Sequence, residues 1–298
     1  MDAEKIRSGI GEALKGGVIN PDEDREALKQ LEILTRDLYR YIRSFEFSLP
    51  SQNYGPLNYT YAFYTREKEK GKQVQYRLTI CAYYVRPIIQ RLLSERTLAY
   101  SATLGDYEVF GFETGIEFPF YTLGSDFPAE KTRVYMPSDT PNLPVKNRPR
   151  GEPIGVLNRI AEATARFYKE GGHRSLVVVV SNQERDSFLE VCAREGIEAV
   201  SYGNGVTPKE AARRFKNGEG VVLVGTVANY GEGIDLPRQI APVIFFLRPA
   251  YPPPRSPGAV FEERRFGSMR WALWNWRVMV EALQVRGRNV RSNEDLGV

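Results

Sequence analysis

The chain has 298 residues, enough for about two domains, and its content of 42% hydrophobic and 26% charged residues is ordinary for a globular protein. No apolar run is long enough to cross a membrane, and two separated cysteines with a single histidine exclude a disulfide framework, a zinc site and a Ser–His–Asp triad, which fits a reducing cytoplasm. The net charge of +4 is compatible with a polyanionic partner without requiring one.

The first half of the chain is predicted to mix helix and β-hairpin. Apolar residues at helical spacing predict a helix over about residues 20–44. Alternating apolar residues on both sides of a charged turn predict a hairpin within residues 51–84. A short helix over Arg86–Leu93 and a strand over Thr97–Tyr100 are expected next, followed by a proline-rich connection at residues 137–151.

From Glu152 onward, short apolar runs alternate with amphipathic helices. The runs predict four strands, at Ser175–Ser181, Ala199–Tyr202, Val221–Gly225 and Val243–Leu247. This alternation predicts an α/β fold in which a parallel sheet is covered by helices on both faces. Because ligands collect at the carboxyl ends of the strands in such sheets, the segments that follow strands are the candidates for a functional site.

Two arginines near the end of the chain are the first candidates. Arg288 and Arg291 are three residues apart, so on a helical turn they face the same way. Two converging guanidinium groups suit a phosphate, to which each donates parallel hydrogen bonds. A solvated basic helix end explains the same pair equally well.

A second candidate segment runs from Gly225 to Leu236. Its glycines and the nearby Asp235 could present backbone amides and a carboxylate to a ligand, for example to ribose hydroxyls. A tight turn with capping acids is the more common explanation of such residues on their own. A third segment, Ser101–Thr103, carries little information by itself.

Taken together and in this order, these segments resemble the XPD/DinG family of superfamily-2 DNA helicases. The similar motifs are Ser101-Ala102-Thr103 (motif III), Ser175–Asn182 (motif IV), Glu232–Asp235 (motif V) and Gln284-x-x-Gly287-Arg288-x-x-Arg291 (motif VI). The resemblance covers about residues 75–298, and motif VI matches at every fixed position. It implies the second RecA-like lobe of a helicase.

The resemblance also implies a role for each matching residue. Arg288 and Arg291 would be arginine fingers directed at the γ-phosphate of ATP, and Gln284 would order a phosphate or the attacking water. The remaining roles would be nucleotide binding by Gly233 and Asp235, contact with the nucleic-acid backbone by Thr226, Ser181 and Asn182, and coupling of hydrolysis to movement by Ser101 and Thr103. No metal site is expected in this chain, and the complete protein would use ATP and Mg.

The phosphate-binding loop G-x-x-x-x-G-K-[ST] does not occur in the sequence. Gly11 and Gly16 have its spacing, but Gly17 and Val18 stand where lysine and a hydroxyl residue are needed. We therefore expect a C-terminal fragment that is inactive alone, with Gly297-Val298 beginning a further strand. Its expected parts are a helical remnant of an insertion (residues 1–50), a hairpin with the end of the first lobe and a linker (51–150), and the second RecA-like lobe (151–298).

The expected function is that of the C-terminal part of an ATP-dependent helicase, active in DNA repair in the cytoplasm or on the nucleoid. Its partners would be single-stranded or forked DNA, or RNA, and the missing N-terminal lobe, with no membrane involved. The alternative is a non-catalytic, helicase-like module that binds nucleic acid or a protein. Aromatic residues within Tyr54–Tyr64 favour this alternative if they stack on bases, although a half-buried hairpin face explains them more simply.

Overall fold

The computed structural model describes most of the chain. The described residues are 8–9, 12, 15–16, 25–48, 60–67, 75–82, 85–101, 103–117, 119–124, 129–139, 152–231, 234–236, 239–288, 290 and 295–298. The chain divides into two compact units. The first comprises residues 1–97, 112–116 and 253–270, and the second comprises residues 98–111, 117–252 and 271–298.

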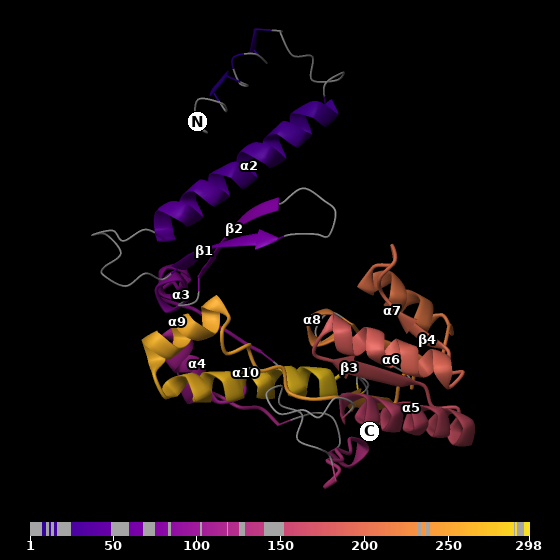
Figure 1. Cartoon of the computed structure of the whole chain (residues 1–298). Coiled ribbons are helices and arrows are strands. Elements are labelled where there is room, and N and C mark those ends of the chain that lie inside the picture. The colour runs from indigo at the N-terminus through magenta and orange to yellow at the C-terminus, as the bar shows by residue number, and fades with distance from the viewer. Residues whose placement is uncertain are drawn as a thin grey trace. The chain divides into compact units, whose positions relative to one another are not determined.

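The first unit contains helices and one antiparallel hairpin (Figure 1). Strands β1 and β2 pair from Thr60 opposite Ala82 to Glu67 opposite Gln75, which confirms the predicted hairpin. Helix α9 begins where the Ser256 side chain accepts a hydrogen bond from the backbone N–H of Ala259. The elements are α2 (Arg25–Ser48), β1 (Thr60–Glu67), β2 (Gln75–Ala82), α3 (Arg86–Leu92) and α9 (Pro257–Phe266).

The second unit is built on a four-stranded parallel sheet, which confirms the predicted α/β fold. The strands lie in the order β4-β5-β3-β6, so β3 and β5 occupy the centre. The bounds are β3 (Ser175–Val179), β4 (Ala199–Ser201), β5 (Val222–Thr226) and β6 (Val243–Phe246), close to the four predicted runs. Every residue of β3 and β5 is buried, as expected for strands covered on both faces.

Helices cover both faces of this sheet, because alternate side chains of each strand point to opposite faces. Leu176 and Val178 pack in one apolar cluster with residues of α7, α8 and α10. Val177 and Val179 pack in another cluster with residues of α5 and α6. The helices are α5 (Glu152–Gly171), α6 (Asn182–Arg194), α7 (Pro208–Lys216), α8 (Val227–Tyr230) and α10 (Met269–Arg286). None of the described helices has the length and apolar character needed to cross a bilayer.

The last residues of the chain lie beside β6 and extend the sheet. Val298 accepts a hydrogen bond from the backbone N–H of Ile244 at 2.7 Å and donates to the carbonyl of Pro242 at 2.8 Å. On its other side, Gly297 forms a parallel bridge with Thr132, just after the short helix η1 (Ala129–Lys131). Gly297 and Val298 therefore form backbone hydrogen bonds on both sides, although they are not part of a regular strand.

The predicted strand at Thr97–Tyr100 is wrong. The segment is not a strand, and the first regular element after it is α4 (Tyr107–Thr114). Its apolar side chains are open to solvent, with Leu98 89% and Tyr100 93% exposed. A strand needs neighbouring backbone to accept and donate its hydrogen bonds, and none of the described strands lies beside this segment.

Cys192 gives a first testable consequence of the packing around α6. The side chain is buried, and burial raises the pKa of the thiol to about 12. Because the thiolate is the reactive form, we expect Cys192 to react very slowly with an aromatic disulfide reagent at neutral pH and rapidly once urea unfolds the chain. The measurement uses a Cys81→Ser variant, so that Cys192 is the remaining thiol. Fast labelling of the folded variant contradicts the burial of this side chain.

Candidate functional site

The carboxyl ends of three neighbouring strands bring polar side chains together. Asn182 follows β3, Tyr202 follows β4, and Thr226 ends β5. The hydroxyl oxygen of Tyr202 lies 3.1 Å from Oδ1 of Asn182 and 3.1 Å from Oγ1 of Thr226. The side chain of Asn229, in α8, donates to the same Thr226 oxygen at 3.1 Å. These four residues form one hydrogen-bonded row across the strand ends, called the polar row below.

The members of the polar row differ in exposure. Asn182 is exposed, Tyr202 and Asn229 are half-buried, and Thr226 is only 6% exposed. Thr226 stands at the N-cap position of α8, but its hydroxyl makes no capping bond and is held within the row instead. Asn182 is therefore the most exposed member of the row, and Thr226 is the most buried.

Ser181 has a structural task at the same edge. Its hydroxyl accepts a hydrogen bond from the backbone N–H of Glu184, and the Glu184 carboxylate accepts from the N–H of Ser181. This reciprocal capping box fixes the start of α6. The same carboxylate accepts from the backbone N–H of Val180 at 3.0 Å and pairs with Nε of Arg248, after β6, at 2.8 Å.

A second group of contacts joins the predicted motif V and motif VI segments. The Arg288 guanidinium donates through Nε and Nη2 to the carbonyl oxygen of Gly231, at 3.0 and 2.6 Å, and through Nη1 to that of Ile234 at 2.9 Å. The backbone N–H of Leu236 donates in return to the carbonyl of Arg288 at 3.2 Å. Asp235 lies exposed between these anchored residues. Because α8 separates Thr226 from Gly231 by a single turn, this group and the polar row lie at the same edge of the sheet.

The remaining predicted site residues lie on other segments or outside the described part. Gln284 is half-buried near the end of α10. Ser101 accepts a hydrogen bond from the backbone N–H of Thr103 at 3.2 Å, and the next residue, Leu104, accepts one from the indole N–H of Trp276 at 2.8 Å. The Ser101–Thr103 segment is thus tied to α10 rather than to the polar row. Gly233 and Arg291 fall outside the described residues.

The sequence did not identify Tyr202 or Arg185. The Arg185 guanidinium lies over the Tyr202 ring, 4.5 Å from its centre, and is held by two hydrogen bonds to Oδ1 of Asp186. The available signal was positional, because Tyr202 lies at the carboxyl end of a strand just as Ser181 and Thr226 do. That signal is weak without knowledge of which strands are neighbours.

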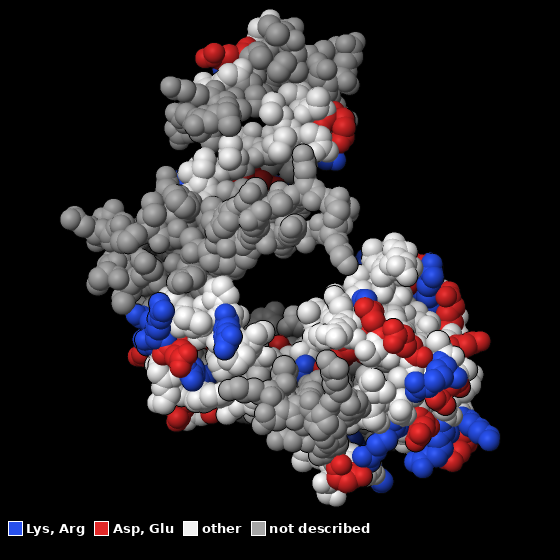
Figure 2. Space-filling model, viewed as in Figure 1, with Lys and Arg blue, Asp and Glu red and all other residues white. Residues whose placement is uncertain are grey.

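Charge on the visible face of the second unit is mixed. Figure 2 shows lysine, arginine and acidic side chains interspersed over the described surface in this view, without a continuous basic area. The part of the chain that the structure describes also contains no group of three His, Cys, Asp or Glu side chains able to hold a metal ion. The amide and hydroxyl groups of the polar row at the strand ends can form hydrogen bonds with a ligand.

Comparison with known protein families shows what residues of this unit are similar to. A family model described as the helicase C-terminal domain matches residues 164–298. Residues 164–298 are therefore similar to a helicase C-terminal domain. No curated protein matches the chain.

This chain is also similar to solved structures, over a longer part of its length. A structure titled XPD helicase matches with a TM-score of 0.51 and 18% identity over 74% of this chain and 41% of that one. A second, titled as apo XPD, matches with a TM-score of 0.52 and 18% identity over 74% of this chain and 46% of that one. The chain thus spans less than half the length of either helicase. The predicted resemblance to the C-terminal portion of an XPD-type helicase, with its RecA-like parallel sheet, is confirmed.

Proposed function

We propose that this chain is the C-terminal part of an ATP-dependent nucleic-acid helicase, which contributes residues to a nucleotide site and part of the nucleic-acid track. The observation that carries the proposal is the contact of Arg288 with the Gly231–Ile234 loop, at the carboxyl edge of the sheet. This contact joins the two segments that resemble motifs V and VI. The helicase C-terminal domain match and the XPD-like fold support the same function.

The nucleotide side of the proposal rests on donor chemistry. A guanidinium at position 288 suits a phosphate, an exposed carboxylate at Asp235 suits ribose hydroxyls, and Gln284 can order a water or a phosphate oxygen. We propose that these groups contact one side of ATP. Mg would be held by residues other than those described, because they offer no cluster of metal ligands. The roles of Gly233 and Arg291 at this site, and of Ser101 and Thr103 in coupling, belong to the proposal.

The nucleic-acid side of the proposal rests on the polar row. Its residues contribute amide and hydroxyl groups, which bind phosphate oxygens without reading bases. Asn182 supplies the exposed contact with the strand. Thr226 is buried within the row, and Ser181 caps the helix that carries Asn182. We propose single-stranded or forked DNA as the ligand, with RNA as the alternative strand chemistry. Action in DNA repair, in the cytoplasm or on the nucleoid, is part of the same proposal.

Binding of a labelled single strand by the purified chain tests this function. We expect anisotropy to report binding at low salt, weakening with added salt because counterions are released from phosphates. We also expect no ATP hydrolysis, since the sequence has no phosphate-binding loop. DNA and RNA strands of the same sequence identify the preferred chemistry, and a blunt duplex serves as control. The absence of single-strand binding at the lowest salt counts against the proposal.

A non-catalytic, helicase-like binding module is the second candidate. The hydrogen bonds of Arg288 to the carbonyl oxygens of Gly231 and Ile234 are compatible with this candidate as well, because they form without a nucleotide. A reading frame directly upstream that encodes a phosphate-binding loop supports the helicase. A genomic context without such a frame supports the module.

A further inference from the structure

The Tyr202 hydroxyl is the donor at the centre of the polar row. An amide oxygen only accepts hydrogen bonds, and a phenol has one proton to donate. The Tyr202 proton is directed at two acceptors, Oδ1 of Asn182 and Oγ1 of Thr226. The Thr226 oxygen also accepts a hydrogen bond from Asn229. With Oδ1 of Asn182 taken, the group that Asn182 can offer a ligand is its Nδ2, which donates two hydrogen bonds.

The Tyr202 ring is held from several sides, so its hydroxyl has a fixed position. The Arg185 guanidinium covers the ring, and the Tyr230 ring meets it edge-on with 5.9 Å between centres. Beneath it, β5 has glycine at position 225, where an added Cβ would lie 3.1 Å from Cε1 of Tyr202 and 2.2 Å from the Tyr230 ring. Glycine at this position therefore allows both rings to approach the strand.

We propose that Tyr202 is a positioning residue for nucleic acid, holding the exposed Asn182 amide with its Nδ2 donors directed at the phosphodiester backbone of a single strand. The inference rests on the proposed function. Its ligand is the phosphate of a strand that crosses the ends of β4, β5 and β3, which are adjacent in the sheet. Phosphate contacts carry no sequence information, so the binding at this position is independent of base.

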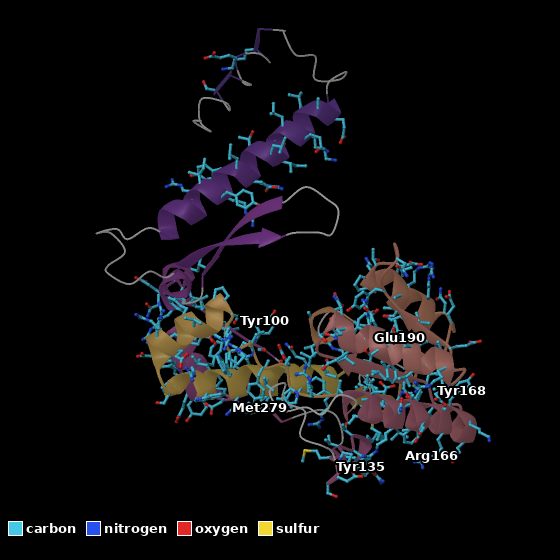
Figure 3. The ribbon with its side chains drawn as sticks, viewed as in Figure 1. Tyr100, Tyr135, Arg166, Tyr168, Glu190 and Met279 are labelled. Carbon is cyan, nitrogen blue, oxygen red and sulfur yellow. The ribbon has the colours of Figure 1, made fainter. Side chains whose placement is uncertain are left out.

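Replacing Tyr202 by phenylalanine removes the hydroxyl and keeps the ring under Arg185. The Asn182 amide then loses the bond that orients it, and both of its orientations become accessible. We expect about three- to tenfold weaker binding of a labelled oligothymidine, the usual effect of one hydrogen bond. Tyr168→Phe, on α5 (Figure 3), makes the same chemical change at an exposed tyrosine and is expected to leave the affinity unchanged.

A double-mutant cycle separates positioning from general stabilisation. If Tyr202 acts through Asn182, then Tyr202→Phe has no further effect on affinity in an Asn182→Ala background. Asn182→Asp keeps an acceptor for the Tyr202 proton but replaces the two donors by an anionic oxygen. We expect Asn182→Asp to bind more weakly than Asn182→Ala, because the carboxylate repels phosphate. A merely structural role of the row does not produce this order.

The outcomes distinguish this inference from the function on which it rests. Absence of binding by the unaltered chain overturns the proposed function, and the inference with it. Normal binding by the unaltered chain, together with unchanged affinity of Tyr202→Phe or additive losses in the cycle, overturns the inference alone. Thermal unfolding confirms that each variant is folded. If Tyr202→Phe does not fold, equal affinities of Asn182→Asp and Asn182→Ala overturn the inference, since position 182 is on the surface.

Discussion

Alanine in place of Arg288 or Arg291 is expected to lower ATP hydrolysis about 10³–10⁵-fold in a helicase that contains this chain together with a first lobe, the range measured for arginine fingers. The reason is electrostatic, because a guanidinium stabilises the charge that develops on the transferred phosphoryl group. Nucleotide binding should persist, since most contacts to the phosphates come from the phosphate-binding loop. The measurement pairs steady-state ATP hydrolysis with the affinity for a fluorescent nucleotide.

The contacts of Arg288 add a distinction between the two arginines. Arg288 donates hydrogen bonds to the carbonyl oxygens of Gly231 and Ile234. Arg288→Ala should therefore also remove these bonds and lower the melting temperature of the protein. Lysine in its place keeps the charge but cannot form the same fork of bonds, so Arg288→Lys should also lose thermal stability. Wild-type hydrolysis in both alanine variants contradicts the proposed role of these arginines at the nucleotide.

The core of the second unit could be predicted because its signal is local. Strands β3 and β5 are short apolar runs bounded by polar residues, and helix α7 begins with a threonine cap followed by proline. Such patterns depend on neighbours in sequence, which are visible without a structure. The strand predicted at Thr97–Tyr100 failed for the complementary reason. The residues of this segment do favour a strand, but a strand also needs a neighbouring strand with which to pair. The local sequence does not show whether such a neighbour exists.

The sequence identified the segments that form the candidate site, but it did not identify the contacts between their residues. The sequence places Asn182 and Thr226 after strands, but the order β4-β5-β3 decides that Tyr202 lies between them. In the same way, residue spacing does not reveal that Arg288 donates to the carbonyl oxygens of Gly231 and Ile234, more than fifty residues earlier in the chain. The order of strands in the sheet and the contacts between distant loops depend on the whole fold, so residue spacing alone does not predict them.

Alanine in place of Glu184 is expected to lower the free energy of unfolding by about 2–4 kcal/mol, a large effect for one surface-proximal residue. The Glu184 carboxylate is 10% exposed, pairs with Arg248, and accepts from the backbone N–H groups of Val180 and Ser181. Its removal leaves a largely buried guanidinium and two backbone donors without this acceptor. Urea unfolding measures the change, and Glu190→Ala, on the same helix (Figure 3), is the matched control, since Glu190 is exposed.

Arg248→Ala should cost less, about 1–2 kcal/mol, because Glu184 keeps its two backbone donors when the arginine is gone. The double variant should then be no less stable than Glu184→Ala alone, since the penalty of the single change includes an unpaired Arg248. Strictly additive losses would show that the two side chains do not interact. If Glu184→Ala were as stable as Glu190→Ala, the capping box and the ion pair would contribute nothing to the stability of the start of α6. This is the position of Asn182, the exposed member of the polar row.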